Sequence, residues 1–142
     1  MSHVTVTEIV LAVVQRCGRI CIARRSNQVR TSPGLWSVVT GYVEPGVQPA
    51  EQAWTEIEEE LGLRPPDVWL VRSGPARALT SPGSGKRFRV YPFLFDSATE
   101  CEVTLNWEHS EVTWAESSRL SDPDCVAWQH DIVQSLLAPS GL

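Results

Sequence analysis

Three glutamates spaced for one side of a helix are the residues of this chain best suited to chemistry. Glu56, Glu59 and Glu60 follow an i, i+3, i+4 spacing, so on a helix they share one face. Carboxylates held this close repel one another, and a divalent cation would relieve the repulsion. Because carboxylate oxygens are hard ligands, the spacing indicates a site for Mg²⁺ or Mn²⁺. Taken alone, the same spacing is also typical of a solvated helix face, so the surrounding residues must decide.

The segment around these glutamates predicts the helix that must position them. Pro49 suits a first helical position and Gly62 suits a C-cap, which predicts a helix over 49–61. Glu58 lies about 160° from Glu60 on the helical wheel, so we expect it to face solvent. The opposite side carries an apolar stripe that would pack on a core: Ala50, Ala53, Trp54, Ile57 and Leu61.

The stretch 41–63 resembles the Nudix box of the Nudix hydrolases, whose pattern is G-x5-E-x7-R-E-U-x-E-E-x-G-U with U aliphatic. Gly41 opens the match, residues 56–60 supply its acidic core, and Gly62 and Leu63 close it. The preceding residues 35–40 match the strand that leads into the box. The metal-binding part of the pattern is therefore complete in this chain.

Two positions depart from the pattern. Val47 stands where the family has its first Glu, and Thr55 stands where it has Arg. In the family the Arg is thought to orient the following Glu, and Thr55 is too short for that role. Losing such support around a metal ligand typically costs on the order of 10–100-fold. We therefore expect a slow or substrate-shifted enzyme, and the alternative is a Nudix-fold module that binds or senses a nucleotide without cleaving it.

The resemblance implies a fold and a reaction. The fold is an α/β/α sandwich with a mixed β-sheet, in the α/β (α+β) class, over a single domain of residues 1–142. The reaction is metal-dependent hydrolysis of a pyrophosphate bond in a nucleoside or organic di- or triphosphate. The implied metal ligands are Glu56, Glu59, Glu60 and the carbonyl of Thr40, with Glu56 and Glu59 catalytic. Thr at position 40 is similar to the dihydroneopterin-triphosphate type of pyrophosphatase.

Contacts to the substrate are expected from several further positions. Arg24 and Arg25 end a predicted strand, where they are either solvated edge charges or, for one of them, a phosphate contact. Glu44 matches a frequent acidic position of the family. Trp36 is either part of the core or a pocket wall that stacks on a base or pterin. Arg25, Glu44 and Trp36 are the residues we assign to substrate binding.

Glu108 is the leading candidate for a general base outside the box. The segment W-E-H-S-E-V-T-W resembles a phrase of the dihydroneopterin-triphosphate branch in which the corresponding Glu approaches the metals. His109 follows it, with a reference pKa near neutrality. The alternative is that Glu108, His109 and Glu111 form only a polar loop.

The remaining elements follow from apolar runs and turn residues. Loops are expected at 26–34 and, as a long mobile connection, at 73–86. Pro92 places its strand at an edge or a bulge. Residues 139–142 are expected to fray. The strands are expected at 5–15, 20–24, 35–40, 67–72, 88–95, 101–105 and 112–114, with a closing helix at 126–137.

Composition limits the function classes. The 142 residues are 42% hydrophobic, enough for a packed core. The net charge of −5 argues against binding nucleic acid through its phosphates, and the chain lacks the apolar run of about 18 residues that a membrane span needs. The four scattered cysteines are read as reduced thiols, and no secretory signal opens the chain, so a cytoplasmic location is expected. The expected partner is a small phosphorylated substrate, and the resemblance is compatible with a homodimer.

Overall fold

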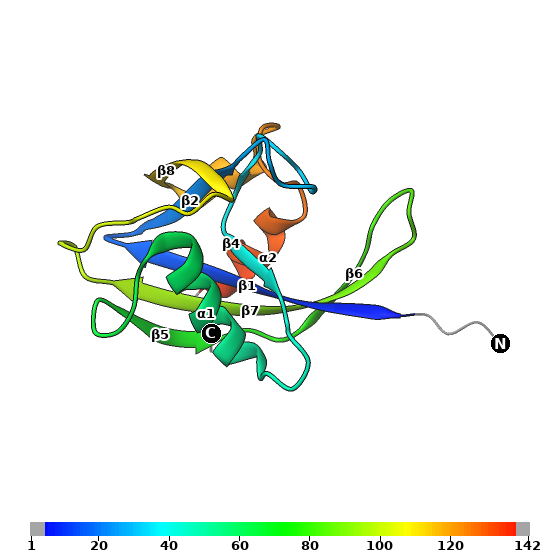
Figure 1. Cartoon of the computed structure of the whole chain (residues 1–142), viewed down its shortest axis with the longest axis horizontal. Helices are drawn as coiled ribbons and strands as arrows, with labels where there is room; N and C mark the ends of the chain where they lie inside the picture. Colours follow the sequence, from blue (N-terminus) through cyan, green and yellow to red (C-terminus); the bar gives the residue numbers. More distant parts are fainter. Residues whose placement is uncertain (1–4, 139–142) are drawn as a thin grey trace.

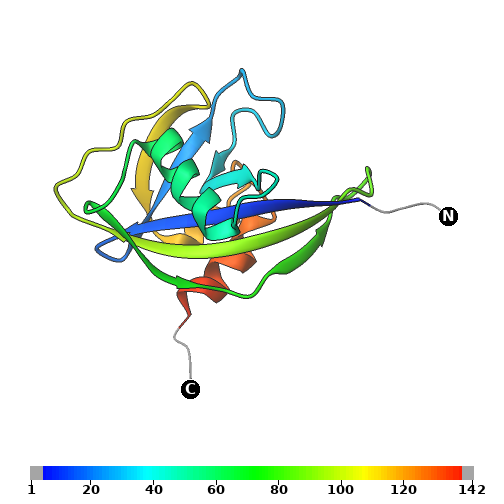
Figure 2. The ribbon, with the colours of Figure 1, turned by 60° about the horizontal axis from the view of Figure 1, so that its bottom comes forward.

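The computed structural model describes residues 5–138, which form a mixed β-sheet between two helices. Figures 1 and 2 show helix α1 on one face of the sheet and helix α2 on the other, so the predicted α/β/α sandwich is confirmed. The elements are β1 (Val6–Arg16), β2 (Arg19–Arg25), β3 (Trp36–Ser37), β4 (Val39–Tyr42), α1 (Pro49–Leu61), β5 (Val68–Ser73), β6 (Arg77–Thr80), β7 (Arg87–Ser97), β8 (His109–Ala115), a 3₁₀ helix η1 (Ser117–Ser121) and α2 (Gln129–Leu137).

Strand β1 is the centre of the sheet, because its continuous apolar run is buried on both faces. It runs parallel to β7 and antiparallel to β2 and β4. Alternate residues serve different layers: Val10 and Val14 belong to the apolar cluster that contains Ile57 of α1. Leu11 and Val13 belong to the cluster that contains Ile132 and its neighbours in α2. The two helices are thus fixed on opposite faces by one strand.

The strand expected over 35–40 is split in two by a buried glutamine. The backbone N–H of Val38 donates to Oε1 of Gln129 at 3.0 Å, instead of to a neighbouring strand. Nε2 of Gln129 donates to Oγ of Ser37 at 2.8 Å. As a result β3 pairs with β2, whereas β4 pairs with β1. The prediction of one continuous strand was wrong for this reason.

The segment 73–86 is a hairpin arm rather than a long irregular loop. Strand β6 pairs antiparallel with β7, and Leu79 packs against the cluster on the α2 side. Figure 1 shows this hairpin extending beyond the rest of the sheet. Pro92 is not at an edge, because its strand β7 lies between β1 and β5. The Pro92 carbonyl accepts the N–H of Gly74 at 2.9 Å, in the connection between β5 and β6. The register shift between Leu70 and Arg72 lies in β5, opposite Leu94 and Phe95, and Pro92 itself pairs in regular register with Leu11, so the bulge expected at Pro92 is not found there.

Residues 101–105 do not form the predicted strand, because their polar groups bond elsewhere. The N–H of Thr104 donates to the Leu61 carbonyl at the end of α1, at 2.8 Å. Nη2 of Arg16 donates to the Cys101 carbonyl at 2.9 Å, and the Arg16 guanidinium lies 4.1 Å from the centroid of the Trp114 ring. These contacts hold the segment in an extended path along the edge of α1 without a sheet partner.

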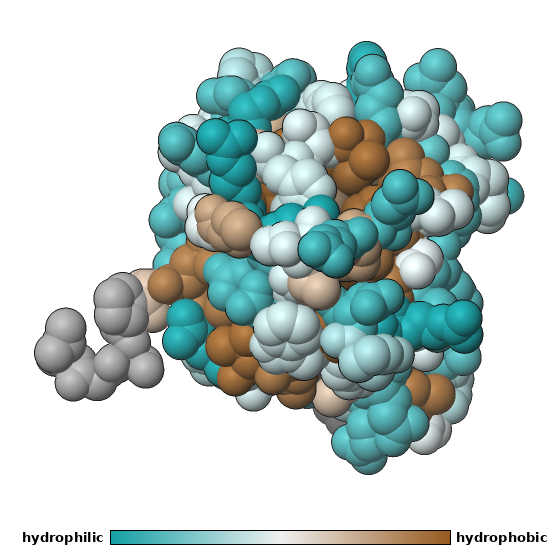
Figure 3. All heavy atoms as spheres, turned by 90° about the vertical axis from the view of Figure 1, so that its left-hand side faces the viewer, coloured by the Kyte–Doolittle hydropathy of each residue, from teal (hydrophilic) through white to brown (hydrophobic). Residues whose placement is uncertain are grey.

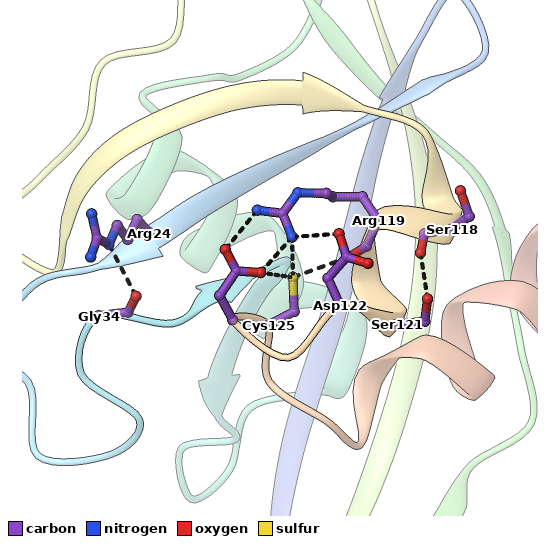
Figure 4. A network of polar contacts seen from close by, with 8 residues as sticks. Arg24, Gly34, Ser118, Arg119, Ser121, Asp122 and Cys125 are labelled. Atoms are coloured by element: carbon purple, nitrogen blue, oxygen red, sulfur yellow. Dashed lines mark hydrogen bonds and ion pairs between the residues drawn. The ribbon is translucent and has the colours of Figure 1, made fainter.

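The chain end is organised by the connection between β8 and α2. Arg119 of η1 forms ion pairs with Asp122 and Asp124 and donates to Sγ of Cys125 (Figure 4). Val126 donates its N–H to the Trp36 carbonyl, and α2 begins at Gln129, three residues later than expected. The four cysteines are free, and the predicted tail at 139–142 lies outside the described residues.

No helix within residues 5–138 has the length and apolar character to cross a membrane. On the face shown in Figure 3, apolar residues form separate patches bordered by polar ones. Three consecutive apolar residues of β5 remain exposed: Trp69, Leu70 and Val71.

Candidate active site

A cavity of about 580 Å³ collects most of the residues predicted to do chemistry. Glu56 and Glu59 of α1, Glu108, Thr40 of β4 and Arg25 of β2 all line it. Its aromatic walls come from Tyr42, Phe88, Trp107 and Trp128, and the hairpin arm adds Leu79, Thr80, Ser81 and Pro82. Charged groups and flat apolar rings therefore face the same space, as a phosphorylated ring compound would require.

Helix α1 positions its three glutamates at different depths. Pro49 occupies the first turn, and Gly62 ends the helix in the left-handed conformation at φ 68°, as predicted. Glu56 is half-buried, Glu59 is exposed, and Glu60 retains only 1% of its exposure. Glu60 is thus buried and is not among the residues that line the cavity, although the spacing had placed it on one stripe with Glu56 and Glu59. Glu58 is exposed and faces Arg64 at 4.0 Å, away from the other three.

The carboxyl groups are poorly accommodated as anions. Burial, followed by the charge of Glu59, raises the pKa of Glu56 to about 7. Burial, followed by the charges of Glu108 and Glu56, raises the pKa of Glu60 well above its ordinary value. A nearby cation would favour ionisation of all of them, which is the electrostatic behaviour expected of a metal-binding cluster.

Glu60 faces His109 in a dry environment. Oε1 of Glu60 lies 3.6 Å from Nε2 of His109, and each side chain is 1% exposed. Burial, followed by the charge of Arg25, lowers the pKa of His109 to about 4, so the imidazole is neutral at neutral pH. Oε2 of Glu60 and Nδ1 of His109 are buried and have no hydrogen-bond partner among the described residues. An unpartnered buried carboxylate oxygen of this kind is an available ligand.

The donors fit a hard divalent cation in type. Carboxylates and a backbone carbonyl are the ligands that Mg²⁺ prefers. Among residues 5–138, however, no three His, Cys, Asp or Glu side chains are arranged around one point as metal ligands. The unpartnered Oε2 of Glu60 and the raised pKa of Glu56 are the observations that favour a cation here.

Glu56 is wedged between Gly41 and Gln52. A Cβ at Gly41 would collide with the Glu56 carboxyl group, so glycine here allows the Glu56 side chain its position against β4. On the other side, Nε2 of Gln52 donates to Oε1 of Glu56 at 3.3 Å, and Oε1 of Gln52 accepts the N–H of Glu44 at 3.1 Å. Gln52 was not among the site residues predicted from the sequence. Its position four residues before Glu56, among apolar neighbours, is the signal that could have revealed it.

The two arginines at the end of β2 separate in the structure. Arg25 lines the cavity, and Nε and Nη2 donate to the carbonyl and Oγ1 of Thr31 at 2.7 and 2.9 Å. Arg24 points elsewhere: it pairs with Glu111 at 3.2 Å and donates to the Gly34 carbonyl (Figure 4). Only Arg25 is placed to meet a ligand in this cavity.

Of the other predicted site residues, one lines the cavity and two do not. Glu108 lines the cavity, and Asn106 donates to its Oε1 at 3.3 Å. Trp36 packs against the cluster on the α2 side, and neither it nor Glu44 is among the cavity-lining residues. Trp128 and Gln129 line the cavity although the sequence analysis did not single them out. They follow an irregular segment, and no pattern in the sequence predicted that they would line the cavity.

Known proteins resemble this chain in sequence and in fold. The family model described as NUDIX domain matches residues 5–136. This chain belongs to the Nudix family. The Nudix chain is 26% identical over 121 residues to nucleoside triphosphatase NudI of Enterobacter sp. (strain 638), covering 82% of this chain and 86% of NudI.

Solved structures show the same fold at lower identity. The MutT protein of Methanosarcina mazei Go1 superposes with a TM-score of 0.75 at 22% identity, covering 95% of each chain. The dihydroneopterin triphosphate pyrophosphohydrolase of E. coli gives a TM-score of 0.71 at 18% identity, covering 92% of this chain and 93% of that one. Nudix hydrolases generally need a divalent metal, and they act on small phosphorylated substrates.

Proposed function

We propose that this Nudix chain is a Mg²⁺- or Mn²⁺-dependent pyrophosphohydrolase of a nucleoside triphosphate or a related organic di- or triphosphate, with residues 1–142 acting as one domain. The observation that carries the proposal is the convergence of Glu56, Glu59 and Glu108 with Arg25 in one aromatic-walled cavity. The four free cysteines support a reducing, cytoplasmic location.

The proposed metal ligands are the carboxylates of Glu56, Glu59 and Glu60 and the carbonyl of Thr40. When bound, a divalent cation neutralises charge on the diphosphate and lowers the pKa of a coordinated water. The unpartnered Oε2 of Glu60 supports its place among the ligands. The half-buried position of Glu56 puts its carboxylate at the inner wall of the cavity, where water is partly excluded.

Two residues are proposed to handle the proton and the phosphate. Glu108 accepts the proton of the attacking water at Oε2, while Asn106 holds its Oε1. Arg25 donates from Nη1 to a phosphate oxygen, because Thr31 already holds its Nε and Nη2. Trp107 and Trp128 offer rings on which a nucleobase or a pterin can stack.

A substrate panel with matched glutamate variants tests the proposal. Nucleoside triphosphates come first, because the relative NudI is a nucleoside triphosphatase, and dihydroneopterin triphosphate comes next, because of Thr40. Phosphate and pyrophosphate release are measured with Mg²⁺. We expect Glu59→Gln and Glu108→Gln to lower kcat by about 100-fold or more. Glu58→Gln, on the exposed side of the same helix, should leave kcat within about twofold, as surface changes usually do.

The outcome also decides between hydrolysis and binding alone. No turnover above the Glu59→Gln level on any substrate would contradict the proposal. Calorimetry that then showed metal-dependent nucleotide binding would support the binding or sensing module suggested by Val47 and Thr55.

A further inference from the structure

Gln52 is a buried polar side chain on the same side of α1 as Glu56, one helical turn before it. It is 3% exposed, and it lies between the loop that follows β4 and the Glu56 carboxylate. Its amide orientation is determined by chemistry. The Glu44 N–H can only donate, so the amide oxygen must face it, and the amide NH₂ must then face Glu56. Both ends of the amide are therefore engaged, one with backbone and one with a proposed metal ligand.

The surroundings of Glu56 show why this donor matters. Its ionisable neighbours are the carboxyl groups of Glu59, Glu60 and Glu108. Glu59 and Glu108 cannot donate when ionised, and Glu60 can donate to Glu56 only as a protonated acid, a bond that is lost when Glu60 is ionised to bind a cation. Gly41 leaves no side chain on the opposite side. Gln52 is thus the amide donor that fixes where the Glu56 carboxylate lies.

Thr55 does not supply this contact. Its side chain is exposed, and its hydroxyl donates to the Glu51 carbonyl at 3.1 Å along the helix. A neutral amide also brings no positive charge to the cavity, so it orients Glu56 without repelling a cation. The loop is closed by the Val47 N–H, which donates to the Glu44 carbonyl at 3.1 Å. The Glu44 N–H that holds the Gln52 amide oxygen therefore belongs to a tight turn.

We propose that Gln52 is a positioning residue that holds Glu56 as a metal ligand, in place of the arginine that Thr55 replaces. The inference rests on the proposed function, because it gives Glu56 its role at the metal. Gln52 acts through Glu56 and does not itself reach the cavity.

The test compares Gln52→Met with wild type. Methionine conserves the unbranched shape and removes both hydrogen bonds. Gln134→Met is the matched control: Gln134 is a half-buried glutamine of α2 whose Nε2 donates to Ser117 at 2.9 Å, and it does not line the cavity. The readouts are Mn²⁺ affinity by electron paramagnetic resonance, the free energy of unfolding, and kcat and KM on the best substrate of the panel.

We expect Gln52→Met to weaken Mn²⁺ binding and lower kcat by about 10–100-fold, with KM changed little. Gln134→Met should leave the Mn²⁺ affinity unchanged even where it lowers stability. Gln52→Glu keeps an acceptor for the Glu44 N–H, which protects the fold, but it replaces the donor to Glu56 by a carboxylate. Its kcat should fall at least as far as that of Gln52→Met.

Adding Thr55→Arg to Gln52→Met should raise kcat more than it does in wild type, so the two changes should be non-additive. Additive effects would show that Gln52 does not stand in for the arginine. A Gln52→Met protein that binds Mn²⁺ and turns over as wild type does would overturn the positioning role and leave the proposed function intact. A wild type that binds no Mn²⁺ would overturn both.

Discussion

Glu56, Glu59 and Glu60 belong to one helix but have different surroundings. Their spacing was sufficient to predict that they share a face, and it could not show that Glu60 is 1% exposed while Glu59 stays in solvent. The burial of Glu60 depends on His109 at the start of β8, which lies about 50 positions further along the sequence and covers the Glu60 side chain. The proposed metal site would therefore depend both on local helix geometry and on residues distant in the sequence that cover Glu60.

The raised pKa of Glu56 predicts a pH dependence of stability in the metal-free protein. The folded-state pKa is about 7, whereas an unfolded glutamate titrates near 4.3. Between these values the folded chain binds more protons, so the free energy of unfolding falls as pH rises through this window. Denaturant unfolding with chelator present should show this fall in wild type and in Glu58→Gln, and a smaller one in Glu56→Gln.

His109 acts with the opposite sign, and the comparison of variants separates the two effects. Its pKa is lowered to about 4, so the stability it contributes is lost as pH falls from about 6.5 towards 4. His109 is unchanged in Glu56→Gln. Identical pH profiles for Glu56→Gln and wild type would contradict the raised pKa of Glu56.

Gly41→Ala tests the close approach of Glu56 to the backbone of β4. The added Cβ would collide with the carboxyl group, so Glu56 must move. We expect kcat to fall by about 10–100-fold, as for a displaced metal-ligand environment, while the protein stays folded. Steady-state kinetics and circular dichroism measure the two effects. Wild-type kcat in this variant would mean that Glu56 is free to move without loss.

At the level of elements, Gln129 determines how β3, β4 and α2 meet. It is 1% exposed and satisfies the Val38 N–H and the Ser37 hydroxyl at the point where one strand becomes two. The same residue lines the cavity. The split in the strand therefore lets β4 carry Thr40 and Gly41 towards α1 while β3 stays with β2.

Gln129→Leu should destabilise the protein strongly. It leaves the buried Val38 N–H without an acceptor, at about 1–3 kcal/mol, and removes one of the two hydrogen bonds of the Ser37 hydroxyl, which still donates to the Val38 carbonyl. Gln134→Leu, on the same helix but half-buried, should cost about 1 kcal/mol. Urea unfolding of both variants gives the comparison. Equal losses would indicate that the buried amide network adds little.

Some elements could be predicted from the sequence and others could not. The box helix and the central strand were predictable, because periodic apolar residues and helix-end signals specify them locally. The sandwich was expected from the resemblance of residues 41–63 to the Nudix box. Strand β6 was missed because Pro and Gly dominate residues 74–85, although Leu79 packs on the core. Residues 101–105 resemble a strand in sequence. In the structure the Thr104 N–H donates to the Leu61 carbonyl and the Cys101 carbonyl accepts from Arg16, and no local sequence pattern predicts these contacts.

For the whole molecule, the cavity brings together residues from most of the chain, from Ile9 to Gln129. A ligand bound there should stabilise the folded state by linkage. Mg²⁺ at 100 times its dissociation constant would add about 2.7 kcal/mol to the free energy of unfolding. Differential scanning calorimetry should show a higher Tm with Mg²⁺ than with chelator in wild type and Glu58→Gln, and a smaller difference in Glu59→Gln. The same Tm with Mg²⁺ and with chelator would argue against a metal site.

The hairpin arm of β6 and β7 supplies one wall of the cavity, through Leu79, Pro82 and Phe88, and none of the carboxylates. The proposed reaction and the substrate preference would therefore be determined by different parts of the chain. Under the proposed function, natural variation in the length or sequence of the arm would change which compound is accepted, while the glutamates of α1 would keep the chemistry constant. A related protein with an unchanged helix and a divergent arm is the expected evolutionary signature of a new substrate.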